Sequence, residues 1–202
     1  MRNTKELFSL FYNCVEFLAP SVFIEAGCRE ATASKEIKRR LPECSVFAYE
    51  AGKESFDLFH HSICSAGVEH INMAISDTKG EGVFYKHNQG LTYGNNSLVV
   101  RNEPGWETAQ KVQKDTLDNL HYDPNETFCL WIDVEGHGYE VLQGASNILK
   151  NTKLIMIEVE QLQFWKDQKL DTEIIELLSE DFKILQRDQE YPNQYNIIFQ
   201  RK

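Results

Sequence analysis

Short apolar runs alternate with amphipathic segments along most of this chain. Runs without internal polar alternation are typical of strands that are covered on both faces of a sheet. These runs are residues 22–24, 45–49, 69–75, 128–132 and 153–159. Between them, apolar residues recur at spacings of three and four, which is the helical period. The pattern predicts an α/β fold around a mostly parallel sheet.

An amphipathic helix is expected over residues 1–20, and we expect Thr4 to cap it. Glu6 and Glu16 interrupt its apolar residues, so this segment is neither a signal peptide nor a membrane span. The chain as a whole reads as one domain, in which residues 22–200 form a Rossmann-like core.

Later elements are predicted from capping residues and spacing. Thr32 or Ser34 can cap the helix after the first strand, and Asp171 can cap a helix near the end of the chain. One helix after the fourth strand is indicated by Tyr139, Leu142, Ala145 and Leu149. Residues 182–185 and 195–199 are expected to form a closing antiparallel pair of strands.

The alternation breaks after Thr78. Residues 83–86 suit an edge strand, and residues 87–105 form a long segment rich in asparagine and glycine. A long irregular segment in a compact domain is usually disordered or functional. Its side chains suit an acceptor with several hydroxyl groups, and a mobile surface loop is the alternative. The side chains in question are Asn88, Tyr93, Asn95, Asn96 and Trp106.

Charge and cysteine content narrow the range of partners. The net charge of -10 argues against nucleic acid and anionic membranes, because phosphates are bound chiefly by clustered lysine and arginine. The one basic cluster is typical of the solvated side of a helix and consists of Lys35, Lys38, Arg39 and Arg40. The five cysteines form no C-x-x-C pair, which indicates reduced thiols in a cytoplasmic protein.

Acidic residues recur where the expected strands end, at Glu25, Glu50, Asp77 and Asp133. In an open α/β sheet, ligands bind over the carboxyl ends of the strands. Gly27 permits a close approach of the backbone to a ligand, and Glu50 can accept hydrogen bonds from both hydroxyls of a ribose. The alternative for Glu25 and Glu50 is helix capping or simple solvation.

The dinucleotide fingerprint G-x-G-x-x-G is absent, which disfavours a pyrophosphate ligand. A cofactor without phosphates, such as S-adenosylmethionine, tolerates a first turn with fewer glycines. Glu25 would then face the amino or sulfonium charge of that cofactor.

Motifs along residues 22–160 resemble, in the same order, those of FkbM-family S-adenosylmethionine-dependent methyltransferases. They are Phe23-Ile24-Glu25-Ala26-Gly27, Ala48-Tyr49-Glu50-Ala51, Ala74-Ile75-Ser76-Asp77, Asn96-Ser97-Leu98, Thr116-Leu117-Asp118, Ile132-Asp133-Val134-Glu135-Gly136-His137 and Ile157-Glu158. The Asp-Val-Glu-Gly-His block is the most specific. The resemblance implies a class I methyltransferase fold, a three-layer sandwich with a mostly parallel seven-stranded sheet and an antiparallel last strand. It also implies methyl transfer to an oxygen, often a sugar or polyketide hydroxyl.

The resemblance implies a set of cofactor-binding residues, which are Glu25, Ala26, Gly27, Cys28, Glu50, Ala51, Ile75, Ser76, Asp77 and Asp133. It places Glu50 on the ribose and Asp77 near the adenine, with Glu25 and Gly27 at the methionine end. The family usually has Asp-x-Gly-Ala-Asn-x-Gly at the first turn, whereas residues 25–31 of this chain have alanine, Ala31, in place of the second glycine and the charged pair Arg29 and Glu30 in the loop.

Transfer of a methyl group from a sulfonium to a hydroxyl needs a positioned nucleophile and removal of its proton. Asp133, Glu135 and His137 are the candidates, with His137 as the general base and the acids orienting the acceptor. The alternative is that His137 caps the helix or binds a backbone carbonyl. No dedicated metal-ligand spacing is present, so no metal is expected; magnesium held by Asp77, Asp133 and Glu135 is the alternative.

Two other functions are compatible with the sequence. One is a methyltransferase-like domain that has lost the cofactor and binds a glycan or another partner. The other is an NAD-dependent oxidoreductase, which would need the glycine-rich first turn that this chain lacks.

Overall fold

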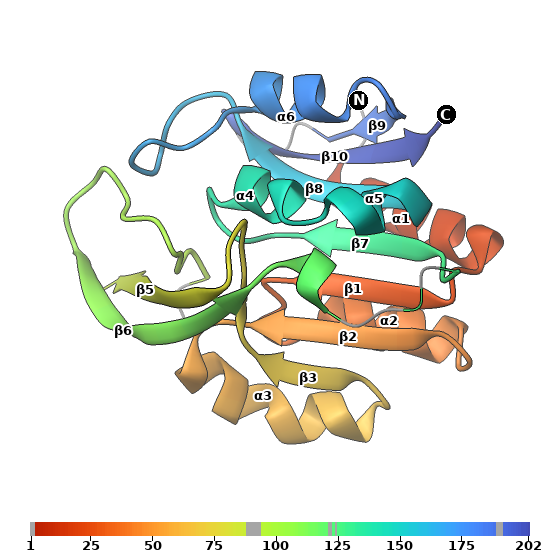
Figure 1. The fold of residues 1–202 in the computed structure, drawn as a ribbon, viewed down its shortest axis with the longest axis horizontal. Helices are drawn as coiled ribbons and strands as arrows, with labels where there is room; N and C mark the ends of the chain where they lie inside the picture. Colours follow the sequence, from red (N-terminus) through yellow and green to blue (C-terminus); the bar gives the residue numbers. More distant parts are fainter. Residues whose placement is uncertain (1–2, 88–93, 121–122, 124, 189–191) are drawn as a thin grey trace.

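The computed structural model describes residues 3–87, 94–120, 123, 125–188 and 192–202, with only the backbone of residues 107–109 (Figure 1). A seven-stranded sheet lies at its centre, in the order β3-β2-β1-β7-β8-β10-β9. Its strands are β1 (Val22–Ala26), β2 (Ser45–Glu50), β3 (Glu69–Asn72), β7 (Phe128–Ile132), β8 (Thr152–Glu160), β9 (Phe182–Arg187) and β10 (Gln194–Arg201). The first five pair in parallel, and β10 runs antiparallel to both neighbours. The expected sheet and its antiparallel last strand are confirmed.

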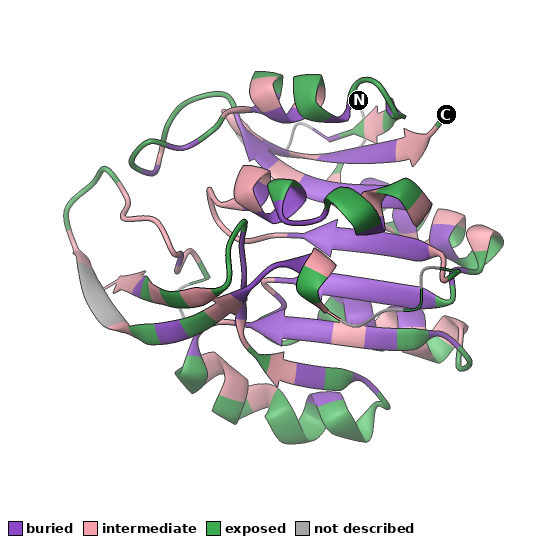
Figure 2. Ribbon diagram, in the orientation of Figure 1, coloured by how far each residue is buried: buried purple, intermediate pink, exposed green. Residues whose placement is uncertain are grey.

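Helices cover both faces of the sheet, as the three-layer prediction requires. One face packs against α1 (Thr4–Leu18), α2 (Thr32–Arg40) and α3 (Lys53–Ser65). The other face packs against α4 (Gly138–Gln143), α5 (Ser146–Asn151), α6 (Asp171–Leu178) and the short 3-10 helix η1 (Leu117–Asn119). Strands β1 and β7 are buried along their whole length (Figure 2). Their unbroken apolar sequence follows from this double coverage.

The first helix begins one residue earlier than expected. Asn3, and not Thr4, is the cap of α1, because the Asn3 side chain accepts a hydrogen bond from the backbone of Glu6 at 2.9 Å. Thr4 is the first helical residue, and its hydroxyl donates instead to Asp188 at 2.9 Å.

The expected caps of α2 and α6 are also wrong. Ala31 precedes α2 in a left-handed conformation, and no side chain of its own caps the helix. At α6, Leu170 holds the cap position and its backbone N–H donates to Glu173 at 3.0 Å. Asp171 accepts from the Tyr195 hydroxyl at 2.6 Å.

The single helix expected after residue 138 is divided into α4 and α5. A Cβ atom at Gly144 would lie 2.2 Å from the carbonyl oxygen of Ser76, so the chain passes too close to β4 for a continuous helix with side chains. The Asp118 carboxylate then begins α5 by accepting from the backbone of Asn147 and Ile148 at 2.9 and 3.0 Å.

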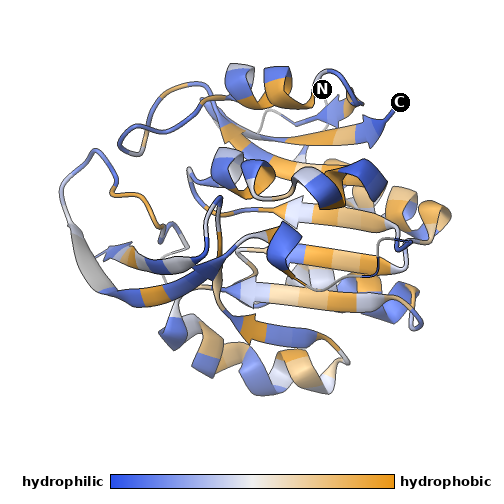
Figure 3. Ribbon diagram, viewed as in Figure 1, coloured by the Kyte–Doolittle hydropathy of each residue, from blue (hydrophilic) through white to orange (hydrophobic). Residues whose placement is uncertain are grey.

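A second, three-stranded sheet was not predicted. It contains β4 (Ala74–Ile75), β5 (Gly80–His87) and β6 (Trp106–Asp115), in the order β4-β6-β5. Residues 69–75, predicted as one strand, are therefore divided between the two sheets at Met73. Figure 3 shows why β6 was missed: the strand is largely polar, unlike the central strands. From β6, Val112 packs in a small apolar cluster with Ala74 of β4 and Phe84 of β5.

No helix within the described ranges is long and apolar enough to cross a membrane. The five cysteines are all free thiols.

Candidate functional site

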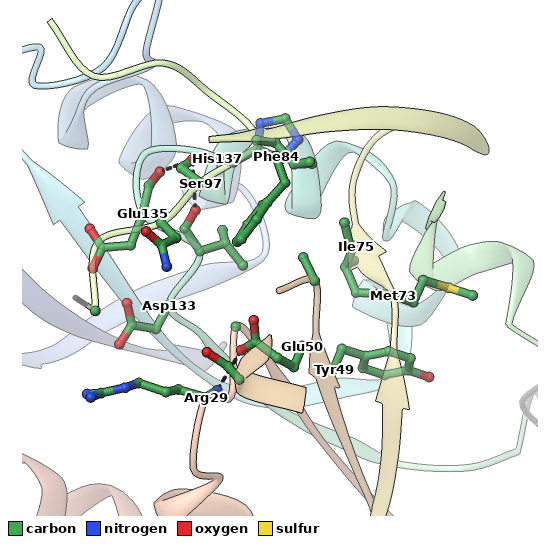
Figure 4. A pocket seen from close by; sticks show the side chains of 18 residues that line it. Arg29, Tyr49, Glu50, Met73, Ile75, Phe84, Ser97, Asp133, Glu135 and His137 are labelled. Atoms are coloured by element: carbon green, nitrogen blue, oxygen red, sulfur yellow. Dashed lines mark hydrogen bonds between the residues drawn. The ribbon is translucent and has the colours of Figure 1, made fainter. Parts of the chain in front are cut away.

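A cavity of about 600 Å³, part of it open to solvent, lies over the carboxyl ends of β1, β2, β4 and β7 (Figure 4). The cavity is lined by the turns after β1, β2 and β7, by β4, by Phe84 of β5 and by residues 94 and 96–98. The cavity therefore lies at the edge of the sheet where the acidic residues at the strand ends predicted a ligand site.

The turn after β1 packs closely against the rest of the sheet. The backbone N–H groups of Gly27 and Cys28 both donate to the carbonyl oxygen of Tyr49 at 3.0 Å. Gly27 has φ of 80°, and a Cβ atom there would lie 1.8 Å from the carbonyl oxygen of Asp133. The packing of the turn therefore requires glycine at this position, independently of any ligand.

Glu50 faces the cavity from the end of β2 and is fixed by two backbone donors (Figure 4). Its Oε1 accepts from Gly52 at 2.7 Å and its Oε2 from Arg29 at 2.8 Å. Burial raises the pKa of the Glu50 carboxyl, and these two hydrogen bonds oppose that rise. Each oxygen retains a second lone pair, so the carboxylate can still accept hydrogen bonds from a ligand.

Beyond Glu50 the cavity wall is largely apolar. Its apolar side chains come from both sheets and from the segment after β5, and they are Ala51, Met73, Ala74, Ile75, Phe84 and Leu98. Such a slot suits a flat aromatic ring system. Ala51 and Ile75, which the sequence proposed as cofactor-binding residues, are part of this wall.

Three carboxyl groups converge at the other end of the cavity. One oxygen from each of Asp133, Glu135 and Glu158 lies within 4.8 Å of the others. In the parallel pair β7 and β8, Ile132 lies beside Ile157, which brings Asp133 next to Glu158. Glu158 was not proposed as a site residue, because the sequence does not reveal which strands are neighbours.

Burial dominates the electrostatics of this acidic group. It raises the pKa of Asp133 to about 6. The pKa values of Glu135 and Glu158 are raised further, first by burial and then by the charge of Asp133. Glu158 accepts from Gln194 at 2.9 Å, whereas Oε2 of Glu135 is buried without a hydrogen-bond partner among the described residues.

Residues distant in sequence hold the turn that carries these acids. Glu135 has φ of 52° and Gly136 has φ of 79°. The Ser97 hydroxyl donates to the carbonyl oxygen of Glu135 at 2.5 Å. A Cβ atom at Gly136 would lie 2.7 Å from the fully buried ring of Trp165. A left-handed non-glycine residue costs about 1 kcal/mol or more, and these contacts impose it on Glu135.

His137 lines the cavity just before α4. Its Nε2 lies 3.0 Å from the hydroxyl of Ser76, which itself donates to Asp77 at 3.0 Å. The hydroxyl proton points to Asp77, so we assign the imidazole proton to Nε2 and the lone pair to Nδ1. Burial lowers the pKa of His137 to about 4, so the ring is neutral at pH 7. The His137 side chain makes no capping hydrogen bond to α4, although the residue holds the cap position.

Several proposed cofactor residues do not line the cavity, namely Glu25, Ala26, Cys28, Ser76 and Asp77. Glu25 is buried and accepts from the backbone of Ser34 at 2.8 Å, so it takes the capping role that the sequence gave as its alternative. Cys28 is buried, and burial raises its thiol pKa. Asp77 is exposed and is not one of the three clustered carboxylates.

The described part of the expected acceptor loop lies against the acidic turn. Residues 96–98 line the cavity, and Arg101 forms an isolated β-bridge with Trp165. Asn88 and Tyr93, which the sequence proposed for this loop, lie outside the described residues.

Comparisons with known proteins agree with this geometry. The family model described as "Methyltransferase FkbM domain" matches residues 21–191. A ribosomal protein L11 methylase from Lactobacillus delbrueckii subsp. bulgaricus is similar in structure, with a TM-score of 0.54, 12% identity and coverage of 98% of this chain and 79% of that chain. An rRNA methylase from Streptococcus thermophilus is also similar, with a TM-score of 0.55, 9% identity and coverage of 100% and 98%. These two likenesses show the fold alone. The comparison with curated proteins found no match.

Proposed function

Because this chain belongs to the methyltransferase family defined by the FkbM domain, we propose that it methylates a hydroxyl group of a small molecule, a sugar or a glycan. The methyl donor is S-adenosylmethionine. The observation that carries the proposal is a single cavity with the fixed carboxylate of Glu50 at one end and the acidic turn of Asp133 and Glu135 at the other.

The residues that line the cavity match the chemistry of this cofactor. Glu50 would accept hydrogen bonds from the ribose hydroxyls, and the apolar wall that includes Ala51 and Ile75 would contact the adenine. Gly27 would contact the methionine end, where the negative charge of Asp133 favours the sulfonium. When bound, the cofactor supplies an electrophilic methyl group.

The residues at the acidic turn then have to position the acceptor and take up its proton. The acceptor oxygen forms the new O–C bond, the C–S electron pair stays on sulfur, and the hydroxyl proton passes to a base. His137 is the proposed base, since its ring is neutral; its buried Nδ1 makes no hydrogen bond to a described residue and lies 3.6 Å from Oε2 of Glu140. Asp133 and Glu135 would orient the hydroxyl.

The acceptor is proposed to be small and rich in hydroxyl groups, rather than a nucleic acid. Asn96, Asp133 and Glu135 give this end of the cavity hydrogen-bonding groups that match hydroxyls. One similar structure is named an rRNA methylase, but a net charge of -10 disfavours contact with a phosphate backbone.

Calorimetry with S-adenosylhomocysteine and with NAD tests the cofactor class. We expect saturable heat with the first ligand and none with the second. Transfer of labelled methyl from S-adenosylmethionine to a panel of sugars and polyketide alcohols would then identify the acceptor. Heat with NAD alone would favour an oxidoreductase, and silence with both ligands would favour a binding domain without catalysis.

Replacement of His137 by alanine should lower turnover by about a hundredfold or more, which is the usual cost of losing a general base. Affinity for S-adenosylhomocysteine should change little, because the cofactor is held elsewhere in the cavity. His61→Ala, an exposed residue of α3, is the control and should retain full turnover. Full turnover of His137→Ala would disprove the assignment of the base.

A further inference from the structure

The carboxylates of Asp133, Glu135 and Glu158 cluster at one end of the cavity. Asp133 and Glu135 lie in the turn after β7, and Glu158 lies in the neighbouring parallel strand β8; their nearest oxygens are at most 4.8 Å apart. Two ligand atoms on one ion are separated by no more than twice the ion–ligand distance, about 4.2 Å for Mg²⁺ and about 5 Å for Ca²⁺. A largest separation of 4.8 Å is within the limit for Ca²⁺ and above the limit for Mg²⁺, which would need side-chain movement.

An independent observation indicates that this group awaits a ligand. Oε2 of Glu135 is buried and has no hydrogen-bond partner in the described part of the chain. A buried carboxylate oxygen without a partner is costly, so a structure usually supplies one. The carboxyl groups of Asp133 and Glu158 are joined by a hydrogen bond, in which Glu158 carries the proton in the absence of a cation.

Among the described residues, no positively charged side chain forms an ion pair with these three carboxylates. Arg101 is the cation whose charge stabilises Glu135, but its guanidinium pairs with Glu103 at 2.5 Å and lies 4.9 Å from the centre of the Trp165 ring. A divalent ion would offset two of the three negative charges of the ionised cluster.

We propose that Asp133, Glu135 and Glu158 bind one divalent cation of the oxygen-preferring class of Mg²⁺, Mn²⁺ and Ca²⁺. Three monodentate carboxylates leave coordination positions open on a six-coordinate ion. Asp133 and Glu135 also line the cavity, so the open positions face the acceptor end. The alternative metal site in the sequence analysis consisted of Asp77, Asp133 and Glu135. In the structure Glu158, and not Asp77, lies beside the other two acids.

A bound cation would restrict the class of acceptor molecules. This inference about the acceptor rests on the proposed function. An ion with open positions coordinates two neighbouring oxygens of one substrate more strongly than a single oxygen. The site therefore favours acceptors with adjacent hydroxyls, such as a sugar diol. Coordination also makes a hydroxyl more acidic, which assists its deprotonation during transfer.

Binding of the ion is measurable without any turnover. The full chain, stripped with a chelator, is titrated with MnCl₂ and the free Mn²⁺ is followed by electron paramagnetic resonance. MgCl₂ and CaCl₂ are titrated by calorimetry. We expect one ion per chain with Kd below about 1 mM. Glu135→Gln and Glu158→Gln should each weaken Mn²⁺ binding at least tenfold.

Asp171→Asn is the matched control, because Asp171 is a buried carboxylate of α6 and asparagine can still accept from Tyr195. It should bind Mn²⁺ like the unchanged protein. Each variant is also titrated with S-adenosylhomocysteine, so that loss of the ion site is distinguished from loss of the fold. Absence of ion binding up to about 10 mM in a protein that binds S-adenosylhomocysteine would overturn the cation site alone. Unchanged Mn²⁺ affinity in both glutamine variants would also overturn it, whereas failure to bind S-adenosylhomocysteine would contradict only the proposed function.

Discussion

Replacement of Gly27 by alanine should destabilise the protein by about 4 kcal/mol or more, because two costs add at this residue. Its φ of 80° is unfavourable for alanine, and the new Cβ atom would lie 1.8 Å from the carbonyl oxygen of Asp133. That oxygen belongs to the backbone and has no side-chain rotation by which to move away. Either β1 or the acidic turn must therefore shift. Chemical denaturation monitored by circular dichroism measures the loss, and failure to obtain folded protein would be its extreme form.

The Gly80→Ala variant separates the conformational cost of a positive φ from the steric cost of the new Cβ atom. Gly80 has φ of 145°, but a Cβ atom there meets nothing within 4 Å. Only the conformational cost remains, so we expect a loss of about 1 to 2 kcal/mol. If Gly27→Ala were no less stable than Gly80→Ala, the close packing of the first turn against Asp133 would be refuted.

Replacement of Glu50 by alanine should weaken binding of S-adenosylhomocysteine at least about a hundredfold. Two contributions are lost together. The variant no longer presents acceptors for the ribose hydroxyls, and hydrogen bonds to an ionised group contribute about 1.5–3 kcal/mol each. It also releases the backbone N–H groups of Arg29 and Gly52, which Glu50 holds at 2.8 and 2.7 Å. Isothermal titration calorimetry measures the change.

The Glu50→Gln variant should give an intermediate affinity for S-adenosylhomocysteine. Glutamine keeps one acceptor oxygen, so its affinity should fall between those of the unchanged protein and of Glu50→Ala. Glu54→Ala, an exposed acid in the first turn of α3, serves as the control for a change in net charge. Thermal unfolding of each variant shows whether the fold survives. A folded Glu50→Ala protein with undiminished affinity would exclude Glu50 from the cofactor site.

The departure at the first turn is compatible with the fold. The family's second glycine is replaced by Ala31, which is buried just before α2 and has φ of 51°, the left-handed conformation that glycine adopts readily. Gly27, where the left-handed conformation and the close approach coincide, is retained. Arg29 has φ of 45°, and its backbone N–H is held by Glu50. The altered turn is thus tied to the residue proposed to bind the ribose.

The sequence by itself determined the sheet and its acidic edge. A strand covered on both faces must be apolar at nearly every position, so β1, β2, β7 and β8 were visible as uninterrupted apolar runs. The residue that follows such a run must lie at the carboxyl end of the strand. The sequence therefore places Glu50 and Asp133 at the edge of the sheet, and both line the cavity there.

Only the tertiary structure decided which of these acids meet. Side chains alternate along a strand, and Glu25 shares the face of Phe23 beneath α1 and α2, where it caps a helix instead of reaching the cavity. Glu158 joins Asp133 because β8 lies beside β7 in a register that hydrophobic patterning does not specify. The same holds for Trp165, whose ring packs against Gly136 across a long separation in sequence. Local patterning fixes where a strand ends, but strand order, facing and register arise from packing between distant segments, and these bring the three carboxylates together.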